Sequence, residues 1–342
     1  MKRFVQIHML TSYPPSNLNR DDLGRPKSAV MGGAQRLRIS SQSLKRAWRT
    51  SDGFMESVKG HVGTRTKELG NQVAERLADA VGTKKAQEWA KEIAAVFGKL
   101  KKNSTEIEQL AHLSPEEMRA VDDLVTRLAE ERKKPQPEDL ELLRAEHSAV
   151  DIAMFGRMLA ARPVYNVEAA VQVSHAITVH DAAVEDDYFT AVDDLNRGDE
   201  DRGAAHVGEA EFGAGLFYTY ICVDTGQLLD NLEDEELAAR SIRALATAAA
   251  TVPPGGKQNS FASRAYAMYM LAEKGEAQPR SLAAAFLKPV RGTDHLGDAI
   301  AAIEHTRQQL DQAYGGDGTS YTMNVSTGEG TLSELVDFCV SE

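Results

Sequence analysis

The order of its strand-like and helix-like stretches restricts this chain to few folds. Residues 4–10 alternate apolar and polar side chains as a strand does, and residues 40–50 place Leu44 and Trp48 on one face of a helix. The same patterns predict strands at 171–180, 215–223, 265–271 and 321–326, and helices at 151–160, 232–251, 295–313 and 331–340. The succession of strand, helix, two strands, helix and strand predicts an α+β fold with a ferredoxin-like core.

Two stretches interrupt this core. Residues 66–147 form amphipathic segments rich in Ala, Leu, Glu and Lys, broken at Gly82, Gly98, Ser114-Pro115 and Pro135-Gln136-Pro137, and predict an all-helical insertion. Residues 181–211 hold eleven acidic side chains against two cationic ones, with Tyr188 and Phe189 among them. So many charges in so short a stretch predict an exposed excursion and not a part of the core.

The two cysteines, Cys222 and Cys339, stand among apolar neighbours. This usage excludes a disulfide framework and a cysteine-based zinc site, and it fits a reducing cytoplasm. The first ten residues lack the apolar stretch and cleavage site of a signal peptide, and no later run approaches the roughly 20 apolar residues of a membrane span. We therefore expect a soluble, cytoplasmic protein without a membrane partner.

The charge is distributed unevenly along the chain. The formal net charge of −12, from 39 Lys and Arg against 51 Asp and Glu, argues against a nucleic-acid partner when taken alone. Residues 1–50, however, hold ten cationic and two acidic side chains, a net of +8, so the remainder carries −20. Such asymmetry indicates an anionic ligand at the N-terminal segment, although a basic segment can also be a solvated surface.

The cationic side chains follow a regular pattern next to a long loop. Residues 11–38 have no helical period and predict a functional loop, because irregular segments of that length are uncommon inside compact domains. In the helix at 40–50, one face carries Gln42, Lys45, Arg46 and Arg49. With the glycine-flanked Lys257-Gln258 turn, these groups predict a site that follows a phosphate backbone; the alternative is a solvated helix face.

Catalytic and cofactor motifs are missing from the sequence. The nine histidines form no metal-binding pair, and no Walker loop, nucleophile elbow or dinucleotide fingerprint occurs. The acidic pairs Asp21-Asp22, Asp186-Asp187 and Asp193-Asp194 have the chemistry to hold Mg²⁺, but adjacent acids on loops usually face water. We therefore predict no catalytic residue, no metal and no cofactor.

Six motifs together resemble one known family. They are NLNRDDLGRPK (17–27), GGAQRLRISSQSLKRAWR (32–49), DIAMFGRM (151–158), SHAITVH (174–180), DDYFTAVDDL (186–195) and PPGGKQ (253–258). In this order they resemble the CasC family, the RNA-binding backbone subunits of Cascade, the type I-E CRISPR surveillance complex. The resemblance implies an RRM-like palm (1–65 and 148–342), a helical fingers insertion (66–147) and a thumb β-hairpin (181–211).

The resemblance also implies roles for individual residues and partners. The positions that match the family's guide-phosphate contacts are Arg20, Lys27, Arg36, Gln42, Lys45, Arg46, Arg49, Lys257 and Gln258. Tyr188 and Phe189 match the thumb residues that wedge against bases, with His206 and Val207 on the returning strand. The implied partners are the guide crRNA, further copies of this chain, the large, small, 5′-handle-capping and crRNA-processing subunits, and target DNA through the guide.

The resemblance leaves two functions to compare. Related subunits that cleave RNA carry an acidic residue in the early loop, whereas the matching residues 31–34 (MGGA) have none, so we predict a non-catalytic antiviral subunit. The alternative is a metal-dependent, RNA-guided endoribonuclease that uses Asp21 and Asp22.

Overall fold

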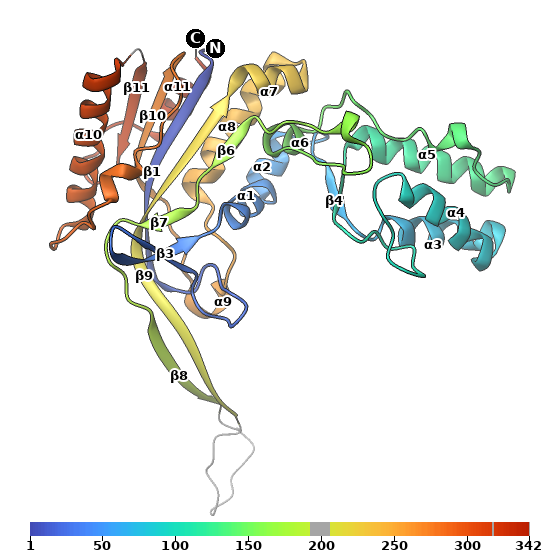
Figure 1. The fold of residues 1–342 in the computed structure, drawn as a ribbon, viewed down its shortest axis with the longest axis horizontal. Coiled ribbons are helices and arrows are strands. Elements are labelled where there is room, and N and C mark those ends of the chain that lie inside the picture. Colours follow the sequence, from blue (N-terminus) through green and yellow to red (C-terminus); the bar gives the residue numbers. More distant parts are fainter. Residues whose placement is uncertain (192–205, 317, 342) are drawn as a thin grey trace, which may run out of the picture. The chain divides into compact units, whose positions relative to one another are not determined.

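The computed structural model describes all of the chain except residues 192–205, 317 and 342. The described residues combine helices with antiparallel strands, which confirms the α+β class (Figure 1). They form two compact units: the first comprises 1–54, 173–222 and 242–342, and the second 55–172 and 223–241. The second unit includes the predicted 66–147 insertion and extends beyond it on both sides. Among the described residues, no helix has both the length and the apolar character needed to span a membrane.

A large sheet organises the first unit. Its strands lie in the order β11 (Thr319–Asn324), β10 (Ala267–Gly275), β1 (Phe4–Ser16), β9 (His206–Asp224), β7 (Ala176–Thr178), β3 (Ala34–Ile39) and β2 (Ser28–Met31). β10 pairs antiparallel with β1, where Phe4 lies opposite Gly275, and β9 pairs antiparallel with β7. β6 (Val171–Val173) and β8 (Glu185–Ala191) also pair with β9.

Helices and apolar side chains complete this unit. α10 (His295–Tyr314) and the 3-10 helix η3 (Ala283–Phe286) share an apolar cluster with the sheet that includes Leu10, Tyr218 and Phe286. α11 (Leu332–Val340) packs against β10 and β11. The unit also contains α1 (Ser41–Arg49) and α9 (Gln258–Phe261), while α2 (Asp52–Ser57) and α8 (Glu235–Thr251) contribute residues to both units.

A buried polar network crosses the sheet. The Nε2 of His8 lies 3.0 Å from Glu273 Oε2, and its Nδ1 lies 2.9 Å from the Tyr218 hydroxyl. Arg280 donates to the same Glu273 carboxylate at 3.1 Å. Burial opposes ionisation of Glu273, but the hydrogen bonds and charges of His8 and Arg280 outweigh it and lower its pKa to about 2.

The early loop is shorter than predicted. β1 continues to Ser16, and residues 28–39 form the β2–β3 hairpin, so the irregular part lies between β1 and β2. The hairpin turns at Gly32 and Gly33, which both have positive φ, and a Cβ on Gly32 would lie 1.5 Å from the Leu287 carbonyl oxygen. Glycines that suggested a loop in the sequence therefore serve a tight hairpin turn.

Other predicted elements also differ in extent. The predicted strand at 171–180 is two short strands, β6 and β7, and the strand at 215–223 belongs to the longer β9. The predicted helix at 151–160 is α6 (Val150–Phe155), which ends because Gly156 adopts φ 78°. The sequence patterns did not predict α7 (Thr225–Leu232), whose N-cap Asp224 accepts a hydrogen bond from the Gln227 backbone N–H.

The second unit has a helical core. α3 (Leu69–Val81), α4 (Thr83–Ala95) and α5 (Pro115–Glu131) bury Leu77, Trp89 and Leu124 in one cluster. The predicted breaks at Gly82 and Ser114-Pro115 are confirmed, since α4 begins after Gly82 and α5 after Ser114. A two-stranded sheet that the composition did not predict joins β4 (Thr64–Thr66) to β5 (Ala111–Leu113), and η1 (Pro137–Leu140) and η2 (Pro163–Tyr165) are short 3-10 turns.

A buried ion pair connects the segments around α5. Glu117 is the N3 residue of a capping box, and its carboxylate accepts hydrogen bonds from the Ser114 and Arg144 backbone N–H groups. Arg157 Nη1 lies 2.7 Å from Glu117 Oε2, and both side chains are almost completely buried. The Arg157 guanidinium also donates to the carbonyls of His112, Arg144 and Tyr165, so this one group holds four acceptors.

Candidate nucleic-acid interface

Apolar anchors fix which face of α1 meets solvent. Ser40 caps the helix by accepting a hydrogen bond from the Ser43 N–H at 3.3 Å, and Leu44 and Trp48 are buried. Gln42 and Arg46 are consequently exposed, and Lys45 is partly exposed. Arg49 follows the same helical spacing, but only 9% of it is accessible, so the stripe is shorter than the sequence pattern suggested.

Local hydrogen bonds shape the loop between β1 and β2. Asn17 Nδ2 donates to the carbonyls of Gly24 and Glu211, which ties the loop to β9. Asp21 Oδ1 accepts from the N–H groups of Leu23 and Arg25, each at 2.9 Å. The Asp21 carboxylate therefore forms the turn, and the loop keeps Arg20 exposed.

A shallow hollow brings three predicted segments together. It has a volume of about 510 Å³ and is lined by loop residues that include Arg20, Asp21 and Asp22, by Ser43 of α1 and by Gly256. Gly256 approaches the loop so closely that a Cβ there would lie 2.2 Å from the Leu18 carbonyl oxygen. The early loop, the start of α1 and the glycine turn thus border one concavity, as a shared ligand site requires.

The two polar residues of the glycine turn differ in whether their side chains can contact a ligand. Lys257 is partly exposed and adopts a left-handed conformation, φ 49°, at the N-cap of α9. Gln258 Nε2 donates to the Pro254 carbonyl at 2.8 Å, so this side chain holds the turn in shape. Lys257 remains the cation that this turn can offer to a ligand.

Three cations converge on a histidine beside α1. Arg38 Nη1 lies 2.8 Å from His175 Nδ1. Partial burial lowers the pKa of His175, and the nearby charges of Arg38, Lys27 and Lys45 lower it further. Neither Arg38 nor His175 was predicted as a site residue. The basic composition of residues 1–50 includes Arg38 but gave no reason to select it, and His175 lies outside that segment.

Arg36 is the clear correction to the predicted phosphate contacts. Its side chain is fully buried, and its guanidinium donates to the Thr178 and Phe286 carbonyls, both at 2.9 Å. Burial lowers its pKa. Arg36 therefore lies in the core, where it joins β7 to the end of η3, and it presents no donor to a ligand at the surface.

The β8–β9 hairpin carries the predicted base-wedging aromatics. Tyr188 is 64% exposed and Phe189 44% exposed, and they lie on opposite faces of β8 because side chains alternate along a strand. The Phe189 ring lies over Gly208 of β9, whose hypothetical Cβ would be 2.5 Å from Phe189 Cζ. The backbones of His206 and Val207 pair with Ala191 and Thr190, but their side chains lie outside the described part of the chain.

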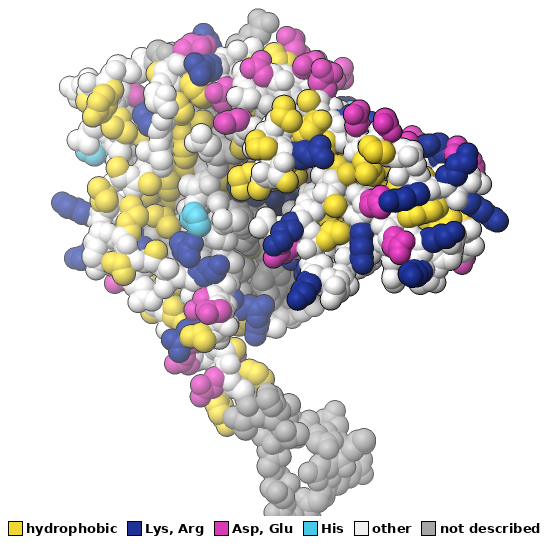
Figure 2. Space-filling view, turned by 45° about the vertical axis from the view of Figure 1, so that its right-hand side comes forward, with side chains coloured by type: hydrophobic (Ala, Val, Ile, Leu, Met, Phe, Trp, Pro, Cys, Tyr) yellow, Lys and Arg dark blue, Asp and Glu magenta, His cyan; other side chains and the backbone are white. Residues whose placement is uncertain are grey.

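Figure 2 shows Lys and Arg side chains gathered where this hairpin leaves the rest of its unit. The exposed or partly exposed cations of the interface are Arg20, Lys27, Arg38, Lys45, Arg46 and Lys257. No described residue belongs to a group of three or more His, Cys, Asp or Glu side chains arranged to hold a metal ion. What the arrangement offers is a set of cations and exposed rings, which is the chemistry that binds single-stranded nucleic acid.

Comparison with known proteins agrees with this chemistry. A chain of a solved structure titled "CRISPR RNA-guided surveillance complex, pre-nicking" is 29% identical, with a TM-score of 0.85 over 98% of this chain and 99% of that chain. A chain from a second "CRISPR RNA-guided surveillance complex" is 26% identical, with a TM-score of 0.64 over 98% of both chains. No curated protein matches the chain. A family model described as CT1975-like protein matches residues 5–337, and the chain therefore belongs to this family of Cas backbone proteins.

Proposed function

We propose that this chain is a non-catalytic crRNA-binding backbone subunit of a Cascade-like, type I-E surveillance complex. The observation that carries the proposal is the hollow beside α1, where the early loop with Arg20, the helix start and the glycine turn meet. The solvent-facing side of α1 adds Lys45 and Arg46. Several copies of the chain would bind along one guide and, with other subunits of the complex, support pairing of the guide with target DNA.

Binding by this surface needs no chemical step. Arg20, Lys45 and Arg46 neutralise phosphates, and the exposed rings of Tyr188 and Phe189 stack against bases. A guide held in this way is ordered before its target arrives, so pairing loses less conformational entropy. Sequence recognition is left to Watson–Crick pairing, because phosphate contacts carry no sequence information.

The geometry of the early loop supports a non-catalytic role. A metal-dependent nuclease holds its cation with carboxylates that are free to coordinate. Asp21 Oδ1 instead accepts two backbone hydrogen bonds that shape the loop. Incubation of labelled guide and target RNA with Mg²⁺ tests this point: we expect no specific cleavage, and cleavage that disappears in Asp21→Ala would establish the endoribonuclease in its place.

The salt dependence of RNA affinity tests the binding surface. Each phosphate contact on single-stranded RNA contributes about −0.7 to the slope of log K against log salt, so Arg20→Ala/Arg46→Ala should reduce the slope by about 1.4. When the salt concentration rises from 50 to 200 mM, the RNA affinity of the variant should therefore fall by a factor roughly sevenfold smaller than that of the wild type. The control Lys84→Ala/Lys85→Ala removes two exposed cations of α4 in the second unit. An unchanged slope in the first variant, or an equal change in the control, would remove Arg20 and Arg46 from the interface.

A further inference from the structure

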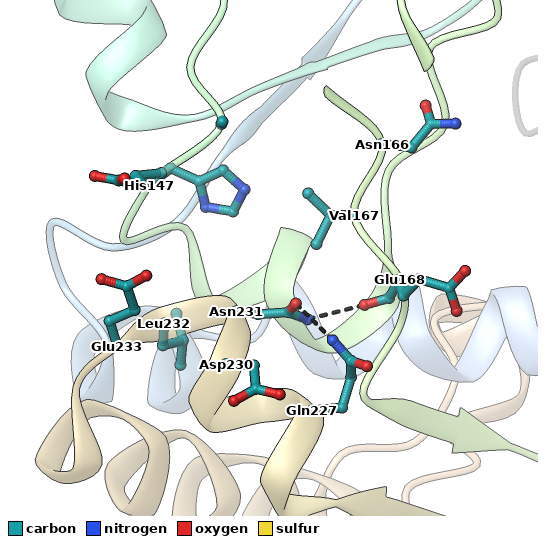
Figure 3. Close-up of a pocket in the computed structure, with 11 residues that line it drawn as sticks. His147, Asn166, Val167, Glu168, Gln227, Asp230, Asn231, Leu232 and Glu233 are labelled. Atoms are coloured by element: carbon teal, nitrogen blue, oxygen red, sulfur yellow. Dashed lines mark hydrogen bonds between the residues drawn. The ribbon is translucent and has the colours of Figure 1, made fainter. Parts of the chain in front are cut away.

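The second unit contains an acidic pocket that the proposed RNA site does not use (Figure 3). It has a volume of about 330 Å³ and lies between the C-terminal end of α7, residues 145–147 and residues 166–168. Four carboxylates line it, from Glu146, Glu168, Asp230 and Glu233, and no Lys or Arg does. All four of these side chains are exposed, and none forms an ion pair with another described residue.

The polar floor of the pocket is fixed by hydrogen bonds. Asn231 Nδ2 donates to the carbonyls of Ala153 and Glu168, at 3.0 and 2.8 Å. Its Oδ1 accepts from Gln227 Nε2 at 2.9 Å (Figure 3). This holds α7 and the 166–168 segment together without neutralising any of the four carboxylates. The like charges around the pocket therefore lack a cation, and a bound cation would relieve their mutual repulsion.

A buried histidine adds a second kind of group to the pocket. His147 is only 9% exposed, and its ring is turned toward the pocket centre in Figure 3. Its Nδ1 accepts a hydrogen bond from the Ala149 N–H at 3.3 Å, so the neutral ring carries its proton on Nε2. Nε2 is buried within the protein and has no hydrogen-bond partner among the described residues. The pocket thus combines carboxylates that attract a cation with a donor that requires an acceptor.

We propose that this pocket binds an arginine side chain, together with its neighbouring peptide carbonyl, from a partner protein. A guanidinium offers five N–H donors in a planar fork that matches carboxylates. His147 Nε2 is itself buried, so the peptide carbonyl accepts its proton once the ring turns to expose this atom. The volume suits one long side chain and part of its backbone. RNA does not fit this chemistry, because four carboxylates repel phosphate, so the pocket takes a protein partner and not the guide.

The test uses the full chain and two short peptides. The probe is acetyl-Gly-Arg-Gly-amide, and its control is the same peptide with uncharged citrulline, an isostere of arginine. Titration followed by nuclear magnetic resonance should show binding of the arginine peptide and at least tenfold weaker binding of the citrulline peptide. Glu146→Gln/Glu233→Gln should weaken arginine-peptide binding at least fivefold, whereas Asp123→Asn/Glu130→Gln, two exposed acids of α5, should leave it unchanged.

Equal binding of the two peptides would overturn the proposal, and so would an equal loss of binding in the α5 control. Complete displacement of the peptide by 1 mM Mg²⁺ at constant ionic strength would also overturn it, because it would indicate a metal site. His147→Phe measures the contribution of the histidine. This variant should bind the arginine peptide more weakly but should keep the preference for arginine over citrulline. The salt slope of RNA binding by each variant should match that of the wild type. This second readout verifies folding and keeps failure of the pocket distinct from failure of the RNA interface.

Discussion

Removal of the Arg157 guanidinium should destabilise the region around α5 more than the removal of any exposed charged side chain of that region. Arg157→Met leaves the buried Glu117 carboxylate without its cation and deprives the carbonyls of His112, Arg144 and Tyr165 of a donor. Breaking a buried pair in this way costs about 3–5 kcal/mol. At about 1.4 kcal/mol per factor of ten, the opening equilibrium of this region should rise between roughly a hundredfold and a few thousandfold.

Hydrogen exchange of the α5 amides in the full chain measures this change, because it reports the free energy of local opening. Arg119→Met on the same helix is the matched control: Arg119 pairs with Glu116 at 3.2 Å at the surface, so its loss should cost less than 1 kcal/mol. Arg157→Met/Glu117→Gln should recover part of the loss, since the neutral amide leaves no stranded charge. The reasoning is refuted if Arg157→Met exchanges no faster than Arg119→Met, or if the double variant is less stable than Arg157→Met alone.

Two further predictions concern the first unit. In Gly208→Ala, the new methyl group would lie 2.5 Å from Phe189 Cζ, so the ring must move by about 1 Å or more. We expect RNA affinity to fall roughly two- to tenfold, with an unchanged salt slope. Gly53→Ala, whose Cβ meets nothing within 4 Å, is its control, and an equal loss there would contradict the role of the ring. Because the pKa of Glu273 is lowered to about 2 from 4.5, its contribution of about 3 kcal/mol is complete above pH 4.5 and lost as pH falls toward 2. Urea unfolding across this range should show the loss in the wild type and a smaller one in Glu273→Gln, and equal losses would exclude Glu273 as the cause.

Elements defined by local signals could be predicted from the sequence. Ser40 and Ser114 cap α1 and α5, and Gly82 separates α3 from α4, because capping and helix breaking depend on side chains within a few residues. The β2–β3 hairpin was missed for the opposite reason. Its Gly32-Gly33 turn has the composition of a loop, and only the close approach of Leu287, distant in the sequence, shows why glycine is required.

The candidate site was predictable to the extent that it depends on helical spacing. The exposed positions of Gln42 and Arg46 follow from the apolar positions of Leu44 and Trp48. The burial of Arg36 does not follow from its neighbours in the sequence, since its hydrogen-bond acceptors belong to residues 178 and 286. Likewise, Arg38 meets His175 only because β3 pairs with β7, so tertiary pairing determines which cations are available.

The continuity of β9 has a consequence for how such proteins can be recombined. Its outer residues pair with β8, from Phe212 opposite Glu185 onward, while Tyr218 further along the same strand pairs with Ile177 and contacts the His8 network. A hairpin exchanged as a cassette would therefore have to be joined in the middle of a paired strand. A one-residue error at that junction would reverse the facing of every side chain beyond it. Grafting a hairpin from a relative should succeed only when the number of residues between Phe212 and Tyr218 is kept.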